Sequence, residues 1–168
     1  MRFLEKLTRL VSAICMVGVG VSFAVLIAVV LIQVVGRSLG ASPVWTEELT
    51  RFALLYLAAF GVGLSFRSGD LVNVDVVCES LPAPMPRVLR MVSAVLTGAL
   101  ALVLIPYAWK FTAIGKMQTS PALGVRMDYI HFTVVLLLVT LFVFAALRVI
   151  NMLAGRTDGL PVNSLEED

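Results

Sequence analysis

The stretch LVSAICMVGVGVSFAVLIAVVLIQVV, residues 10–35, contains no charged side chain. At a rise of about 1.5 Å per residue, an α-helix of this length crosses a hydrocarbon core of about 30 Å. It is longer than the apolar segment of a secretory signal peptide, and no small-residue cleavage site follows it, so we expect a helix that the protein retains. This stretch predicts that the chain folds in a lipid bilayer.

Three further apolar runs follow, at residues 49–66, 87–109 and 130–150. The chain of 168 residues is 60% hydrophobic and 14% charged, and its mean hydropathy is +0.99, far above that of a soluble domain. We therefore expect an all-α integral membrane protein, a single membrane domain over residues 1–168. Its four tilted transmembrane helices span about 10–36, 49–66, 87–109 and 130–150.

The segments between the runs predict short interfacial helices and turns. Residues 1–9 are amphipathic and lead into the first span, and residues 68–87 are too short and too charged to cross a membrane. Ser42 and Pro43 are a helix N-cap and first-turn pair, so a helix begins near Pro43. Pro106 is expected near the kinked end of the third span, and residues 157–168 form a flexible acidic tail.

The basic residues predict the orientation of the four spans, which put both termini on the same side. More of them lie on the side of the termini, which favours cytoplasmic termini under the positive-inside rule. The terminal side carries Arg2, Lys6, Arg9, Arg67, Arg87, Arg90, Arg148 and Arg156; the other carries Arg37, Arg51, Lys110, Lys116 and Arg126.

Few residues carry the patterns of catalysis, cofactor binding or nucleic-acid binding. The net charge is only +2 with no basic stripe, so no nucleic-acid partner is expected. Cys15 and Cys78 have no CxxC spacing and are interpreted as free thiols. A single histidine, His131, excludes a bis-histidine haem and makes a metal site unexpected. We expect no cofactor, no metal and no enzymatic activity.

The most informative polar residues lie at the start of the second span, where Trp45, Glu47, Glu48 and Arg51 fall within two helical turns. Arg51 is placed at i+4 from Glu47 and i+3 from Glu48, so one interpretation is an intrahelical ion pair at the headgroup level. The alternative is that one carboxylate, or Arg51, points away from its own helix and pairs with a partner subunit. The spacing leaves both open.

Small residues recur at a spacing that lets membrane helices approach closely. Gly18 and Ser22 in the first span, and Ala59 and Gly63 in the second, are four residues apart. We interpret both pairs as internal packing positions.

Together the motifs resemble one family: the small membrane subunit (DctQ-like small permease) of TRAP transporters, the tripartite ATP-independent periplasmic uptake systems of bacteria. The resemblance covers nearly the whole chain. It is carried by residues 42–48 (SPVWTEE) with Arg51, by Gly61, Arg67, Gly69-Asp70 and Val74-Asp75, and by residues 119–125 (TSPALGV). Arg126 departs from the apolar or small residue more usual there.

The resemblance implies a non-catalytic scaffold in the bacterial inner membrane. Its partners would be a large TRAP membrane subunit with the substrate and sodium sites, a periplasmic substrate-binding protein, and membrane lipid. The system would import an organic acid by sodium-coupled symport. The candidate interface or structural residues are Trp45, Glu47, Glu48, Arg51, Arg67, Ser120 and Pro121.

Two other classes of function are weighed against this one. A membrane anchor of a redox complex conflicts with the single histidine. A self-associating channel or exporter needs polar residues along one face of a span, whereas only scattered hydroxyls such as Ser22, Ser93 and Thr97 occur.

Overall fold

A computed structural model describes residues 2–41, 43–68 and 85–154 of the chain. This part contains four long helices: α1 (Arg2–Ser38), α2 (Val44–Ser68), α4 (Met85–Gly115) and α5 (Met127–Leu153). Each is long and apolar enough to cross a membrane. The expected class, an all-α membrane protein with four spans, is confirmed. The interfacial helix expected within residues 68–87, Cys78 and the tail at 157–168 lie wholly or largely outside the described residues.

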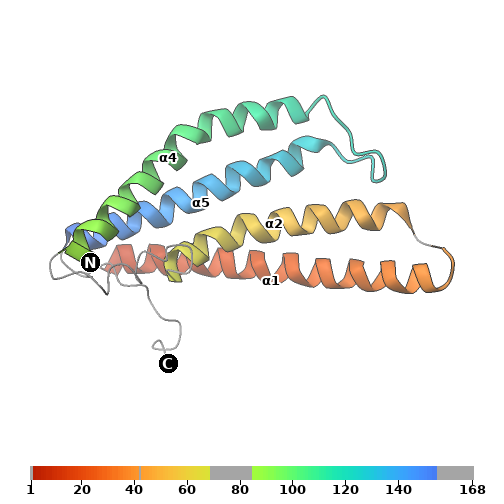
Figure 1. Ribbon diagram of the computed structural model, residues 1–168, viewed down its shortest axis with the longest axis horizontal. Coiled ribbons are helices and arrows are strands. Elements are labelled where there is room, and N and C mark those ends of the chain that lie inside the picture. The colour runs from red at the N-terminus through yellow and green to blue at the C-terminus, as the bar shows by residue number, and fades with distance from the viewer. Residues whose placement is uncertain (1, 42, 69–84, 155–168) are drawn as a thin grey trace.

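The four helices lie side by side in a layer, in the order α4, α5, α2, α1 (Figure 1). Among the described helices, α5 packs against α4 and α2, and α2 packs against α5 and α1. The layer therefore has α4 at one edge and α1 at the other. The N-terminus, the ends of α2 and α5 and the start of α4 share one end of the layer. The opposite end, called here the loop end, carries the α1–α2 and α4–α5 connections.

The helices extend beyond the apolar runs that predict them. The amphipathic residues at the N-terminus belong to α1 itself, and α2 begins at Val44, directly after Pro43. Helix α4 continues through Pro106 to Gly115, six residues past Trp109. A proline inside a membrane helix removes one backbone donor, and the neighbouring turns adjust to it without ending the helix. Figure 1 shows α4 as curved along its length.

The α1–α2 connection is short because α1 ends in a Schellman motif. The Ala41 N–H donates to the Gly36 carbonyl at 2.9 Å, and the Gly40 N–H donates to the Arg37 carbonyl at 3.1 Å. Gly40 has φ +74°, a left-handed conformation that glycine adopts without steric cost. This turn reverses the chain within a few residues and sets α2 antiparallel beside α1.

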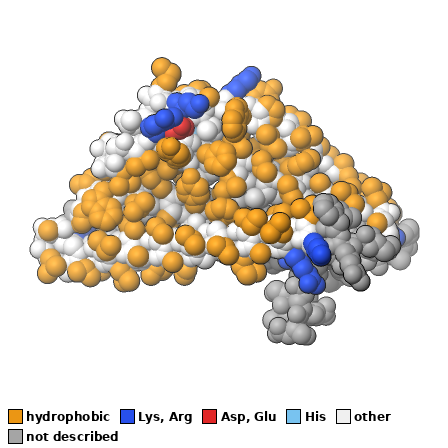
Figure 2. Space-filling model, turned by 180° about the vertical axis from the view of Figure 1, so that it is seen from behind, with side chains coloured by type: hydrophobic (Ala, Val, Ile, Leu, Met, Phe, Trp, Pro, Cys, Tyr) orange, Lys and Arg blue, Asp and Glu red, His pale blue; other side chains and the backbone are white. Residues whose placement is uncertain are grey.

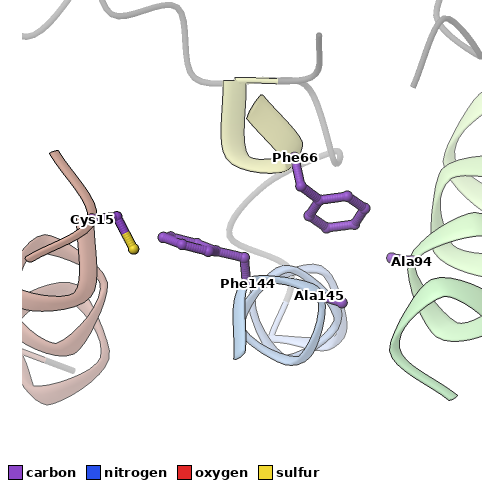
Figure 3. Close-up of a cluster of buried hydrophobic side chains, with 5 residues drawn as sticks. All are labelled: Cys15, Phe66, Ala94, Phe144 and Ala145. Atoms are coloured by element: carbon purple, nitrogen blue, oxygen red, sulfur yellow. The ribbon is translucent and has the colours of Figure 1, made fainter. Parts of the chain in front are cut away.

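The core is divided into two clusters along α5. In the first, Phe144 and Ala145 point to opposite sides of α5, Phe144 towards Cys15 of α1 and Ala145 towards Ala94 of α4, with Phe66 of α2 above them (Figure 3). The second joins α4 to α5 nearer the loop end, and consists of Ala101, Ala108, Val135 and Leu138. Helix α5 is therefore the central packing element of the layer.

Glycines mark the closest helix contacts, as the small-residue spacing predicts. A Cβ on Gly63 would lie 2.9 Å from the Phe144 ring and 3.1 Å from Cβ of Thr140 on α5. A Cβ on Gly18 would lie 2.6 Å from the Phe60 ring of α2. The interpretation of Gly18 and Gly63 as internal packing positions is confirmed.

The broad face shown in Figure 2 is almost continuously apolar over the middle of the layer. Lysine and arginine side chains lie near its edges, with acidic atoms visible beside some of them. On α1 alone, Val17, Val21 and Leu31 are more than half exposed. An apolar surface of this extent is stable only against lipid or another apolar protein surface.

Candidate functional site

The α4–α5 connection at the loop end is an ordered hairpin-like turn. The Ser120 N–H donates to the Val125 carbonyl at 2.8 Å, and the Gly124 N–H donates to the Ser120 carbonyl at 3.0 Å. Gly124 has φ +65°, so glycine is the residue that this turn requires. An isolated antiparallel bridge joins Thr119 to Arg126 at the base. The stretch 119–125 is therefore held by its own backbone.

Glu48 of α2 fastens this turn to the rest of the protein. Its Oε2 atom accepts a hydrogen bond from the Ser120 hydroxyl, and two more from the backbone N–H groups of Ala122 and Leu123, both at 3.1 Å. Ser120 is only 2% exposed. Hydrogen bonds to an ionised carboxylate are stronger than those between neutral groups, so one acid binds three donors of the turn. The Leu123 N–H is shared, since it also lies 3.2 Å from the Ser120 hydroxyl oxygen. We call this contact the Glu48 latch.

Glu47 and Arg51 lie beside the latch and form none of its hydrogen bonds, although the positive charge of Arg51 favours the ionised Glu48 carboxylate. Both side chains are exposed, and the structure describes no ion pair between Arg51 and either glutamate. With Trp45 and Pro121 they line a hollow of about 460 Å³ between the first turns of α2 and the α4–α5 connection. This hollow, which we call the Trp45 hollow, is lined by two acids, one base and an aromatic ring, and the acid not engaged in the latch is Glu47.

The first turn of α2 is fixed by Thr46, a residue that sequence reasoning did not select. Thr46 is fully buried, and its hydroxyl donates to the Pro43 carbonyl at 2.6 Å. The Thr50 hydroxyl then donates to the Thr46 carbonyl at 2.8 Å. These bonds hold Trp45 and Glu47 on the opposite, exposed side of the helix. A threonine beside a proline at a helix start is a weak signal, because many turns have it.

Arg67 lies at the opposite end of α2 from the other candidate residues. Its guanidinium donates to the Ser12 hydroxyl of α1 at 3.0 Å, and Ser12 is buried. The nearby Arg148 guanidinium lies 5.5 Å from the centre of the Phe66 ring. The structure therefore brings together Trp45, Glu47, Glu48, Arg51, Ser120 and Pro121 at the loop end, whereas Arg67 joins α1 to α2 at the terminal end.

Polar contacts connect α2 to α5, and to the α4–α5 connection that precedes α5, at several levels along α2. Towards the terminal end, the Thr140 hydroxyl lies 3.2 Å from the Ala59 carbonyl of α2. Further along, the Tyr56 hydroxyl donates to the Tyr129 carbonyl at 2.7 Å, and the Glu48 latch completes the series. We call this set of contacts, with the Gly63 approach, the α2–α5 seam. Sequence reasoning missed Tyr56 and the cross-helix bond of Thr140, since neither has a local signature.

An apolar groove runs along the same half of the layer. Its volume is about 680 Å³, and it is walled by one stripe of α1, one stripe of α2 and the start of α5. Val17 and Val21 of α1 face Phe60 and Tyr56 of α2 across it. Among the described residues, no group of three His, Cys, Asp or Glu side chains could hold a metal ion. The arrangement is that of a surface for binding apolar molecules.

Comparison with known proteins identifies the family. The family model "Tripartite ATP-independent periplasmic transporters, DctQ component" matches residues 26–155. The isethionate TRAP transporter permease protein DctMQ of Oleidesulfovibrio alaskensis is 26% identical over 117 residues, which is 69% of this chain and 18% of that protein.

A putative TRAP transporter small permease protein of Haemophilus influenzae is 23% identical over 99 residues, 58% of this chain and 59% of that protein. The chain thus spans less than two thirds of the length of either relative. The family model, by contrast, matches this chain from the middle of α1 to the end of α5. The chain belongs to the DctQ component family, the small permease subunits of tripartite ATP-independent periplasmic transporters.

Proposed function

We propose that this chain is a non-catalytic scaffold that braces a large, ion-coupled permease component while that component moves its substrate. The observation that carries the proposal is the α2–α5 seam. It joins the two halves of a four-helix layer at three levels, through Thr140, Tyr56 and Glu48. A layer fastened in this way resists hinge motion between the α1–α2 and α4–α5 pairs, which suits a static support.

The distribution of charge supports the same role. An ion or proton pathway needs polar or ionisable groups at membrane depth. The middle of the broad face in Figure 2 is apolar, and the charged candidate residues lie at the helix ends. Ion coupling, which we propose to be sodium-driven, is therefore assigned to the large component.

The partner is the large permease component of the same transporter. This chain matches only 18% of the DctMQ permease protein. The rest of that polypeptide is long enough to contain a large permease component in the same chain. We propose that the apolar groove and the Trp45 hollow face that component, with Trp45 and Arg51 making the contact at the loop end. Aromatic and arginine side chains are the residue types that most often dominate binding at interfaces.

The substrate is proposed to be an organic acid that a periplasmic substrate-binding protein delivers. Isethionate, named for one relative, is an organic acid anion. We place the protein in the bacterial inner membrane as a multi-pass subunit with cytoplasmic termini, because more lysine and arginine residues lie on the terminal side. The loop end would then face the periplasm.

Co-purification from mild detergent and reconstituted uptake test the proposal. The tagged chain should recover the large component in equal amount, and proteoliposomes should import substrate only when both chains and the binding protein are present. The chain alone should support no uptake. A homo-oligomer that conducts by itself, or a haem-bearing partner, would replace the scaffold with a channel or a redox anchor.

A locked variant tests whether the support is static. In Glu48→Cys/Ser120→Cys, a short bis-methanethiosulfonate cross-linker can join the two thiols across the gap that the longer glutamate side chain fills in the latch. Uptake by the assembled transporter should be the same before and after reductive release of the cross-link, with the wild-type chain treated in parallel. Uptake that is lost on cross-linking and restored by reductant would show that α2 and the α4–α5 connection move during transport.

A further inference from the structure

The corner where α4 ends and α5 begins contains a second hollow, separate from the Trp45 hollow. Its volume is about 370 Å³, and it lies between the last turns of α4 and the first turns of α5. Its lining combines Trp109, Ala113 and Phe132 with two charged side chains, Lys116 and Asp128. An apolar cleft bordered by one cation and one acid differs from the uncharged groove between α1 and α2.

Close backbone packing brings the two charges together. A Cβ on Gly115 would lie 2.7 Å from the Asp128 backbone nitrogen and 2.6 Å from Nδ1 of His131, so only glycine allows this approach of the two helices. The His131 ring stacks on Phe111 with 4.0 Å between ring centroids, and its Nδ1 lies 3.2 Å from the Phe111 carbonyl. These contacts fix Lys116, one residue after α4, beside Asp128 in the first turn of α5.

The Asp128 carboxylate is already oriented by a neighbour. Arg126 donates to both carboxylate oxygens, at 3.2 and 2.6 Å, and the Asp128 side chain is only 13% exposed. An ionised carboxylate has about four lone-pair sites, so Asp128 retains capacity to accept further hydrogen bonds. The three charged groups Lys116, Arg126 and Asp128 sum to one net positive charge, which attracts an anionic group.

The position of the hollow indicates what kind of molecule carries that anion. Trp109 and Tyr129 line it and are each about 60% exposed, and tryptophan and tyrosine are enriched where a membrane meets water. A ligand here therefore needs an apolar part for the cleft between α4 and α5 and a charged part at the aqueous boundary.

We propose that this hollow is a phospholipid-binding site. The lipid phosphate binds the Lys116 ammonium, one acyl chain lies along Trp109 and Phe132, and the Asp128 carboxylate accepts a hydrogen bond from the headgroup. The third contact selects headgroups that carry a donor, such as phosphatidylethanolamine or phosphatidylglycerol, over phosphatidylcholine, which has none. The site does not depend on the scaffold role.

Native mass spectrometry of the full chain in detergent, with each of these three lipids added in turn, tests the assignment. Lys116→Gln should lower the bound fraction of phosphatidylethanolamine and phosphatidylglycerol about fivefold, the usual effect of one cation at a membrane surface. The control is Lys110→Gln, which removes the same charge from the last turns of α4, where the ammonium instead lies 5.6 Å from the centre of the Tyr107 ring. Binding in the control should match the wild type.

Four results would overturn the proposal. An equal loss of bound lipid in the Lys116 and Lys110 variants would show that lipid binding depends on surface charge in general and not on this hollow. Equal binding of phosphatidylcholine would remove the role of Asp128. Displacement of the bound lipid by free phosphoethanolamine, which has no acyl chain, would assign the site to a soluble phosphate compound. Trp109→Ala, which leaves every charge in place, should also weaken lipid binding, and unchanged binding there would exclude the acyl-chain contact.

Discussion

The Glu48 carboxylate of α2 and the Ser120 hydroxyl of the α4–α5 connection form a hydrogen bond across 72 positions of sequence. The same carboxylate oxygen also accepts the backbone N–H groups of Ala122 and Leu123. One side chain of α2 thus accepts hydrogen bonds from three donors of this turn. The latch positions Pro121 against the first turns of α2, and so shapes the Trp45 hollow.

Removing the latch should loosen this turn without unfolding the helices. In Glu48→Ala, amide hydrogen exchange at Ala122 and Leu123 should rise by about tenfold or more, because protection there comes from local structure. Glu47→Ala is the matched control, since Glu47 is exposed and takes no part in the latch. Equal exchange rates in the two variants would show that the turn is stable without the carboxylate.

Two glycines of α2 should respond differently to the same substitution. A Cβ on Gly63 meets the Phe144 ring at 2.9 Å, whereas a Cβ on Gly61 meets nothing within 4 Å. Gly63→Ala should destabilise the fold by about 1–3 kcal/mol of overpacking, reduced by the gain in helix propensity of about 1 kcal/mol. In Gly61→Ala there is no overpacking, so only the gain in helix propensity remains. Thermal unfolding in detergent should rank Gly61→Ala at or above the wild type and Gly63→Ala below both.

The cross-helix bond of Thr140 should contribute measurably to the seam. Its hydroxyl donates to the Leu137 carbonyl of its own helix at 2.9 Å and also lies 3.2 Å from the Ala59 carbonyl of α2. Bonds between membrane helices contribute on average about 0.6 kcal/mol. Thr140→Val should lower the free energy of unfolding by about that amount. Thr133→Val is the control, because the Thr133 hydroxyl donates only within α5, to Ile130. If the two variants lose equal stability, the Thr140 bond across the seam contributes nothing.

The apolar runs predict the spans, because lipid requires long uncharged helices, but they do not predict where the helices end. Helix α4 continues past Trp109 to Gly115, since polar residues at a membrane boundary can stay helical. The local spacing offered Arg51 as the partner of Glu48, and the structure adds Ser120, which no helical periodicity connects to α2. The spacing of Ala59 and Gly63 predicts that Gly63 is a packing position, but it does not predict that Phe144 is the side chain packed there.

Because the turn engages Glu48, the charged side chains left to point towards another subunit are Glu47 and Arg51, with Trp45 beside them in the hollow. Of these, Arg51 and Trp45 are of the residue types that most often dominate interfaces. Arg51→Ala and Trp45→Ala should lower recovery of the large permease component about tenfold or more each, as dominant interface residues do. Arg37→Ala is the control, since Arg37 is also an exposed arginine at the same end of the layer, on α1. Normal recovery with all three variants would move the interface to the apolar groove alone, because the hollow would then bind no partner. Selective loss with Arg51 and Trp45 would place a protein contact at the loop end, and the chain would support its partner there as well as within the membrane.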